Sequence, residues 1–91
     1  MVFKVNQNSI VYGDENRELA RITYPQVKDG VVDIDHTFVD EELRGQGMAG
    51  QLMERCVQEL RSSGRKALTS CSYAAKWFEK HPECADLLAE K

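Results

Sequence analysis

Residues 31–49, VVDIDHTFVDEELRGQGMA, contain the change of pattern that decides the fold. Apolar and polar side chains alternate from Val31 to Val39, which predicts a β-strand. The alternation places His36 on the same face as Ile34 and Phe38. Beyond an acidic turn and a pair of glycines, apolar residues recur at helical spacing. A strand is therefore expected to lead through a glycine-bearing loop into an amphipathic helix.

The sequence after this loop predicts two helices that flank a short strand. The apolar stripe of the first helix consists of Met48, Ala49, Leu52, Met53, Cys56, Val57 and Leu60. Ser62-Ser63-Gly64 is expected to end this helix, because glycine readily takes the left-handed conformation found after a last turn. Ala67-Leu68-Thr69 predicts the strand, and Cys71-Ser72 opens a second helix that ends before Pro82. Glu83 to Lys91 predicts a short terminal helix.

The first forty residues predict an antiparallel meander. Strand-like runs occur around residues 3–5, at Ser9–Tyr12, at Glu18–Tyr24 and at Val31–Val39. Asp29-Gly30 is a hairpin-turn signal before the last of these runs. Four antiparallel strands followed by a strand–helix–strand unit predict the α/β fold class, with a mixed sheet and helices packed on it. A single domain is expected over the whole chain.

Composition excludes several classes of protein. Among 91 residues, 12 are basic and 15 are acidic, so the net charge of −3 provides no general attraction to nucleic acid. No apolar run approaches the roughly 20 residues that span a bilayer, and the first residues lack the layout of a secretion signal. The three cysteines form no C-x-x-C pair, which is typical of reduced thiols and not of a zinc site. We expect a soluble, cytoplasmic protein without a metal, as a monomer or homodimer.

The loop Arg44-Gly45-Gln46-Gly47-Met48-Ala49 has the features of an anion site. Glycines just before a helix expose backbone N–H groups that have no partner within the helix. Together with the positive end of the helix dipole and the Arg44 guanidinium, these donors suit a pyrophosphate. The alternative is a loop that needs glycine only for positive φ angles, as the chain turns from strand to helix. The two glycines alone leave both interpretations open.

The order of strand, acidic turn, glycine-bearing loop and helix resembles the acetyl-coenzyme-A signature of GNAT-type N-acetyltransferases, Gln/Arg-x-x-Gly-x-Gly/Ala. Arg44, Gly47 and Ala49 occupy its defined positions. The resemblance implies that the loop binds the pyrophosphate of acetyl-coenzyme A (acetyl-CoA). The cofactor-binding residues that it implies are Phe38, Val39, Arg44, Gly45, Gln46, Gly47, Met48 and Ala49. Backbone donors near Val39 would orient the thioester carbonyl, between splaying parallel strands at 31–39 and 67–71.

More of the chain resembles the minimal GNAT-like family typified by bacterial YjdJ-type proteins. The matching segments are His36-Thr37, Cys71-Ser72-Tyr73-Ala74 and Trp77-Phe78-Glu79-Lys80-His81-Pro82-Glu83. This resemblance implies a GNAT core that lacks the early helices which ordinarily help to bind the acceptor. The sequence departs from the family at Cys84, where an aromatic residue is expected. The implied reaction is acetyl transfer to an unidentified amine, either a small molecule or a protein.

His36, Cys71 and Tyr73 are the candidate catalytic residues. GNAT enzymes usually place a general base near His36, and imidazole titrates near neutral pH; the alternative is a hydrogen-bonded core residue. Cys71 begins a helix, whose dipole stabilises a thiolate. In a catalytic role, Cys71 either accepts the acetyl group, with His36 as the base, or protonates the departing coenzyme thiolate. The alternative to both roles is a small buried residue that contributes only to packing. Tyr73 is a second candidate acid, or an aromatic residue packed over the sheet.

Other polar groups give weaker signals. Asp33 and Asp35 share a predicted strand face. They are either a carboxylate base, a site for the acceptor amine or a pair that faces water. His81 and Cys84 are too few for a tetrahedral metal site. A small basic cluster lies at the C-terminal end of the first helix, where positive charge interacts favourably with the helix dipole; it consists of Arg61, Arg65 and Lys66. Two other functions stay open: a coenzyme-A-binding or partner-regulated module without turnover, and a thiol-based redox or acyl-carrier protein centred on Cys71.

Overall fold

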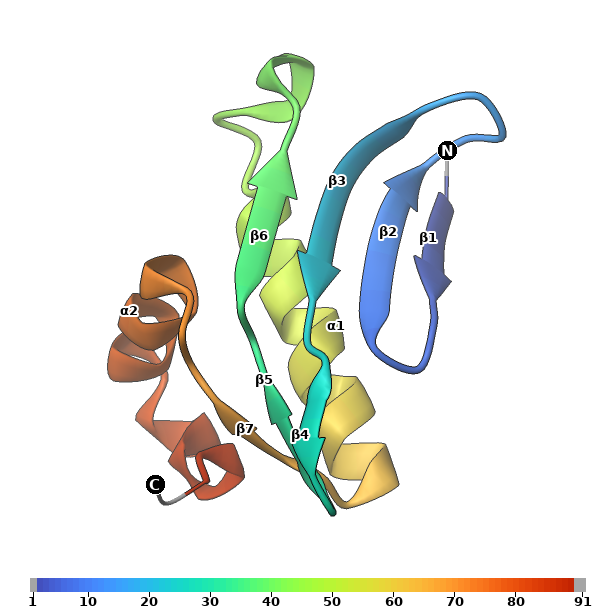
Figure 1. Ribbon diagram of the computed structural model, residues 1–91. Helices are drawn as coiled ribbons and strands as arrows, with labels where there is room; N and C mark the ends of the chain where they lie inside the picture. The colour runs from blue at the N-terminus through green and yellow to red at the C-terminus, as the bar shows by residue number, and fades with distance from the viewer. Residues whose placement is uncertain (1, 90–91) are drawn as a thin grey trace.

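The computed structural model describes residues 2–89, in which a series of short strands is followed by a helix, a further strand and C-terminal helices, as predicted (Figure 1). The strands before the glycine-bearing loop are β1 (Val2–Val5), β2 (Ser9–Gly13), β3 (Glu18–Thr23), β4 (Gln26–Lys28), β5 (Val31–Asp33) and β6 (His36–Val39). After them come the 3-10 helix η1 (Glu41–Leu43), α1 (Met48–Ser63), β7 (Lys66–Leu68), α2 (Ser72–Lys80) and the 3-10 helix η2 (Pro82–Leu87). The predicted α/β fold class is confirmed.

Two small sheets are joined by one long, bent hairpin, whose arms are β3–β4 and β5–β6. The first sheet is antiparallel in the order β1-β2-β3-β6, and the second has the order β4-β5-β7. β5 and β7 are parallel, with Val31 beside Lys66 and Asp33 beside Leu68, as predicted for these segments. The chain passes from β3 into β4 and from β5 into β6, so each arm of the hairpin contributes to both sheets (Figure 1). The exposed strand β4 was not predicted, because it has only three residues, which lie between Pro25 and the Asp29-Gly30 turn signal.

The strand predicted before the loop is interrupted by a β-bulge. The Ile34 N–H donates to the carbonyl oxygen of Leu68 (2.9 Å), whereas the Asp35 N–H donates to the carbonyl oxygen of Thr23 (3.2 Å). Thr23 is also the register partner of His36. Two residues of this strand therefore oppose one residue of β3, and the single predicted strand becomes β5 and β6.

The bulge shifts the alternation of strand faces by one residue. Thr37 pairs with the fully buried Ile22 and is itself half-buried, so its side chain faces the core. His36 and Phe38 lie on the other face and are exposed. The prediction that His36 lies on one face with Ile34 is therefore wrong, as is the alternative of a core residue, whereas His36 and Phe38 do share a face. The cause is the hydrogen bonding of the backbone to β7, which local alternation does not encode.

Helix α1 covers one face of the sheets and supplies much of the core. It ends at Gly64, where a φ of 70° and N–H bonds to the carbonyls of Leu60 and Arg61 close the helix as predicted. Its buried residues are Met48, Leu52, Met53, Cys56, Val57 and Leu60. In the part of the chain that the structure describes, no helix covers the opposite face of the first sheet (Figure 1). None of the described helices combines the length and the apolar character that crossing a membrane requires.

The C-terminal segment folds back onto α1. Helix α2 ends before Pro82, as predicted, but the terminal helix expected over 83–91 is the 3-10 helix η2, and residues 90–91 of that range lie outside the described residues. Arg61 holds the segment through two hydrogen bonds to the Asp86 carboxylate (2.8 and 3.2 Å). These bonds lower the pKa of Asp86, so their contribution to stability is lost when acidification protonates this carboxylate.

We predict that Gly13→Ala destabilises the β2–β3 hairpin. A Cβ at Gly13 would lie 2.1 Å from the carbonyl oxygen of Arg17, and the N–H of Asp14 holds that oxygen (3.0 Å). Backbone atoms would have to move, which costs about 1–3 kcal/mol. Urea unfolding measures the loss. Glu15→Ala, at an exposed position in the same turn, is the control, with a change within about 0.5 kcal/mol. An unchanged unfolding free energy for Gly13→Ala would contradict the prediction.

Candidate active site

The parallel strands β5 and β7 end in a fork. Their ladder continues one residue beyond β5, because Ile34 donates its N–H to Leu68 and accepts the N–H of Cys71 on its carbonyl oxygen, both at 2.9 Å. Beyond Ile34, β6 joins β3, whereas residues 69–71 lead into α2 (Figure 1). We call these two diverging segments, β6 and residues 69–71, the fork.

Strand β6 is the edge strand of its sheet, and its open edge faces the fork (Figure 1). The Asp40 N–H donates to the carbonyl oxygen of Leu19 (2.7 Å). Because bonded residues alternate along an antiparallel pair, Phe38 also directs its backbone groups at β3. The N–H and C=O groups of Thr37 and Val39 therefore point away from β3. Such open-edge groups are suited to bind an extended ligand that carries amides.

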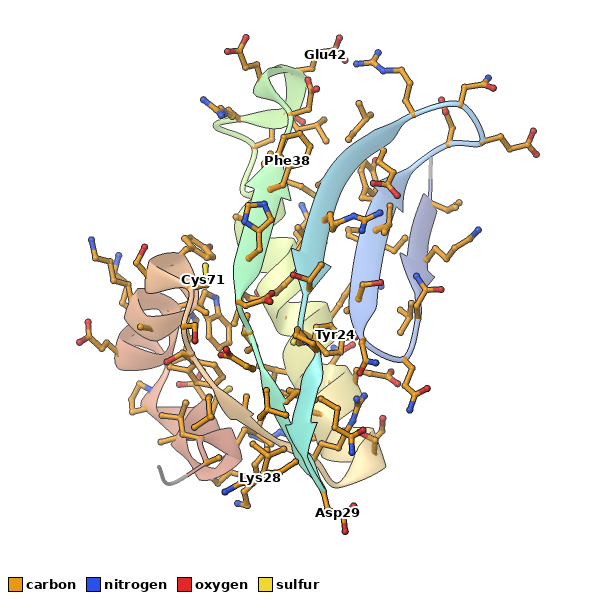
Figure 2. The ribbon with its side chains drawn as sticks, in the orientation of Figure 1. Tyr24, Lys28, Asp29, Phe38, Glu42 and Cys71 are labelled. Carbon is orange, nitrogen blue, oxygen red and sulfur yellow. The ribbon has the colours of Figure 1, made fainter. Side chains whose placement is uncertain are left out.

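Two side chains meet across the fork. Thr37 Oγ1 lies 3.7 Å from Cys71 Sγ, which is within hydrogen-bond distance for sulfur, and both residues are half-buried. Asp33 fixes the residue before Cys71, because its carboxylate accepts the N–H (3.0 Å) and the hydroxyl (2.6 Å) of Ser70. Asp33 therefore clamps the two strands together. Figure 2 shows Cys71 where the chain enters α2.

Tyr73 extends this group of side chains towards the start of α1. Its hydroxyl lies 3.9 Å from the position that a Cβ on Gly50 would take. Partial burial, and secondly the charge of Cys71, raise the pKa of Tyr73, so the phenol stays protonated at neutral pH. The Tyr73 hydroxyl therefore lies close to the first turn of α1.

The glycine-bearing loop presents unpaired N–H groups at the start of α1. Gly45 and Gly47 have φ angles of 83° and 73°, which other residues rarely adopt. No side chain caps α1, its first turn contains no acidic residue, and among the described residues the N–H groups of 47–50 have no hydrogen-bond partner. Arg44 is exposed, with its Nε 3.5 Å from the carbonyl oxygen of Val39. The two features that the sequence left as alternatives, positive φ angles and free donors, are both present.

His36 lies on the opposite face of β6 from Cys71. Thr37 contacts Cys71 from the core-facing side, and neighbouring residues of a strand point to opposite faces. His36 is exposed on the outer face together with Phe38, whose side chain is 41% exposed. Figure 2 labels Phe38 on β6. The structure therefore does not bring His36 and Cys71 together as the base and nucleophile of one pair.

A groove of about 620 Å³ lies on this outer face, over β1, β2 and β3, and not at the fork. Its lining includes Val11 and Arg21 from the strands and residues 14–17 from the turn that joins β2 to β3. Arg21 is the register neighbour of Phe38, so the groove adjoins the outer face of β6. Its volume is in the range of sites for small ligands.

The remaining candidates from the sequence have structural partners. Asp35 accepts a hydrogen bond from the Thr23 hydroxyl. The Nδ1 atom of His81 lies 3.0 Å from a Glu83 carboxylate oxygen, and the His81 ring stacks on Trp77 with 3.9 Å between the ring centroids. The structure describes no group of three side chains able to hold a metal ion among residues 2–89.

The basic residues at the end of α1 also hold other parts of the chain. Lys66 donates to the carbonyl oxygen of Asp86 (2.6 Å), and Arg61 contacts the side-chain carboxylate of the same residue. Arg65 donates to the carbonyl oxygen of Gln7 (2.9 Å). These side chains therefore join η2 and the turn between β1 and β2 to the region of α1 and β7.

Thr37 and Gly50 belong to the fork region but were not predicted from the sequence. The apolar Val39, two residues after Thr37, indicates an inward face, but the stronger alternation through Ile34 and Phe38 obscured this signal. Gly50 lies inside the predicted helix, where glycine costs about 1 kcal/mol relative to alanine. A glycine at such an unfavourable position indicates that another group packs close to the helix there.

Comparison with solved structures reveals relatives of similar fold. A GCN5-like protein of Staphylococcus aureus, determined by NMR, is 36% identical and has a TM-score of 0.80, with 99% of this chain and 89% of that chain covered. A ribosomal-protein-alanine N-acetyltransferase of Brucella melitensis is 15% identical, with a TM-score of 0.60 and coverage of 91% and 63%. A glucosamine-6-phosphate N-acetyltransferase of Arabidopsis thaliana is 20% identical, with a TM-score of 0.55 and coverage of 91% and 60%. The last two show a shared fold.

The family follows from the sequence match. No relative was found among the curated proteins. The model of a family described as GCN5-related N-acetyl-transferase matches residues 8–87, which is most of the chain. The chain therefore belongs to the GCN5-related N-acetyltransferase (GNAT) family, and the predicted enzyme class, an N-acetyltransferase, is confirmed.

Proposed function

We propose that this N-acetyltransferase binds acetyl-CoA, with the pyrophosphate on the glycine-bearing loop and the thioester in the fork, and transfers the acetyl group to an amine. The observation that carries the proposal is the presence of free backbone donors at both ends of the loop, with Arg44 between them. One set is the N–H groups of 47–50, and the other is the open edge of β6 at Thr37 and Val39. A ligand with an anionic head and an amide-bearing arm matches this order of donors.

The loop would bind the pyrophosphate mainly through its backbone. The free N–H groups carry the partial positive charge of the helix terminus, and Arg44 adds a full charge beside them. A Cβ on Gly45 or Gly47 would project into open space, so the glycines leave the backbone uncovered. Gln46 holds the loop by donating from its side chain to the carbonyl oxygen of Glu42 (3.1 Å).

The open edge of β6 would orient the thioester. The Val39 N–H points away from β3 towards the fork, where it can stabilise negative charge that develops on the carbonyl oxygen during transfer. The backbone of Phe38 faces β3 and offers no such donor. Of the two residues expected near the thioester, Val39 is therefore the better placed.

Cys71 would donate its proton to the departing coenzyme sulfur. The positive end of α2 stabilises the thiolate that remains on Cys71. Direct transfer is favoured over an acetyl-cysteine route, because His36, the base which that route requires, points to the other face of β6. Tyr73, which is protonated at neutral pH, is a second donor at the same place.

His36 would accept the proton that the amine loses. Imidazole serves as a general base near neutral pH, and His36 is exposed on the outer face of β6. This face adjoins the groove over β1, β2 and β3, which leaves room for the acceptor. The amine would therefore approach from the side of the sheet opposite to α1.

Titration with acetyl-CoA, followed residue by residue by NMR, tests the binding site. We expect chemical-shift changes at residues 37–39, 44–50 and 71–73, because these segments line the proposed path. With an amine present, free coenzyme A is expected to accumulate beyond one equivalent of enzyme. Changes confined to other segments would overturn the site, and release that stops at one equivalent would favour a binding module without turnover.

Gly47→Ala is expected to weaken acetyl-CoA binding at least about tenfold, or about 1.4 kcal/mol. Gly64→Ala is the matched control at the other end of α1, because the φ angles are 73° and 70° and a Cβ meets no atom within 4 Å at either position. Each substitution carries similar strain, about 1–2 kcal/mol, which thermal unfolding measures. Calorimetric titration compares the affinities. Equal affinity in the two variants would contradict the role of the loop.

Cys71→Ser and His36→Gln are each expected to lower kcat about 100-fold or more, the usual contribution of general acid–base catalysis. Both residues act on the reacting groups and not on the pyrophosphate, so the Kd for acetyl-CoA is expected to stay nearly unchanged. Steady-state kinetics and calorimetry measure the two effects. His81→Gln, which changes the histidine stacked on Trp77, is the control and should keep its kcat. A fully active Cys71→Ser variant would assign Cys71 to packing.

A further inference from the structure

The hydroxyl of Thr37 is the polar side-chain group in hydrogen-bond contact with Cys71. The distance from Thr37 Oγ1 to Cys71 Sγ is 3.7 Å, and the contact is partly buried. It joins β6 to the start of α2, two segments that share no strand pairing. The contact therefore arises from the way in which the fork is built.

The backbone holds Cys71 in position for this contact. The Cys71 N–H bonds the carbonyl oxygen of Ile34 (2.9 Å), and Asp33 fixes Ser70 through two further hydrogen bonds. Cys71 is the N-cap of α2, but its side chain forms no capping bond. Its sulfur is therefore turned to Thr37 and not to the N–H groups of its own helix.

A hydroxyl suits either protonation state of a thiol. It accepts a hydrogen bond from a neutral S–H and, after rotation, donates one to a thiolate. The other titratable group in this region is Tyr73, whose pKa is raised in part by the charge of Cys71. The carboxylate of Asp33 is occupied by Ser70, and the first turn of α1 has no acidic residue. The hydroxyl of Thr37 is thus an uncharged partner of Cys71, and a hydrogen bond that it donates to a thiolate is stronger than one to a neutral thiol, because one of the two atoms then carries a charge.

We propose that Thr37 is a positioning residue that directs the Cys71 thiol into the fork and stabilises the thiolate left after proton transfer. This inference rests on the proposed role of Cys71 as an acid. In the resting enzyme, Thr37 Oγ1 accepts the Cys71 S–H. When the S–H proton passes to the departing coenzyme sulfur, the S–H bond of Cys71 breaks and a new S–H bond forms on the coenzyme. The Thr37 O–H stays intact and donates to the Cys71 thiolate, which solvent later reprotonates.

The test measures alkylation of Cys71 by iodoacetamide as a function of pH, without coenzyme. Thr37→Val removes the hydroxyl but keeps the branched shape, and Thr37→Ser keeps the hydroxyl. We expect the pH of half-maximal alkylation rate to rise by about one unit in Thr37→Val, as loss of one hydrogen bond to a charged group predicts, and to return to the parent value in Thr37→Ser. Peptide mapping by mass spectrometry assigns the modified residue.

The other cysteines provide an internal reference. Cys56 is fully buried, and burial raises its pKa to about 12; Cys84 is 7% exposed. Both are expected to react slowly in every variant that is folded, so fast reaction of Cys56 identifies an unfolded sample. If Thr37→Val does not fold, Thr37→Ala, which also removes the hydroxyl, replaces it and is expected to show the same rise, with Thr37→Ser again as the matched control.

Two outcomes would overturn the inference. One is a Thr37→Val variant that is folded and has the parent midpoint, and the other is a Thr37→Ser variant whose midpoint moves upward. These outcomes differ from failure of the proposed function, because the assay contains no acetyl-CoA. A chain that does not bind acetyl-CoA can still show the expected shift, and a chain that does bind it can lack the shift.

Discussion

The main chain of Ile34 determines the geometry of the whole fork. Its N–H bonds Leu68 and its carbonyl oxygen bonds Cys71, so both backbone groups are used on the side of β7. The next residue, Asp35, bonds Thr23 of β3 instead. The strand thus changes partner within one peptide unit. That change produces the bulge, opens the edge of β6 and places Thr37 opposite Cys71.

The core explains why the switch stays fixed at this residue. The Ile34 side chain is fully buried, as are Ile22, Leu52 and Met53, and burying such a side chain contributes about 1.5–3 kcal/mol. A one-residue slip of the strand would expose Ile34 and bury the charge of Asp35, so the register has a single stable solution. A domain of this size has a small free energy of unfolding, so the burial of one such side chain provides a large fraction of the free energy that keeps the fork folded.

The parts of the molecule that local chemistry determines were predictable, and those that depend on remote backbone pairing were not. The limits of α1 follow from Gly47 and Gly64, whose positive φ angles depend on glycine itself. The glycine-bearing loop was predicted for the same reason. The face of His36 was not, because the alternation of Val32, Ile34 and Phe38 concealed the bulge, which arises from a bond to Leu68, more than thirty positions away. Thr37 was missed as a consequence of that error.

The corrected face changes the chemistry that the fold can support. With His36 and Cys71 on one face, a covalent route through an acetylated thiol and a neighbouring base would have been the natural arrangement. On opposite faces of β6, the two residues instead suit the two ends of a direct transfer. In the proposed mechanism, Cys71 is the acid and lies on the core-facing side of the fork, at the positive end of α2 and in contact with the Thr37 hydroxyl. His36 is the proposed base and is exposed on the uncovered side of the sheet, from which the amine would approach. With one strand between them, the proposed acid and base would not transfer a proton to each other, as an imidazole and a thiol in direct contact would.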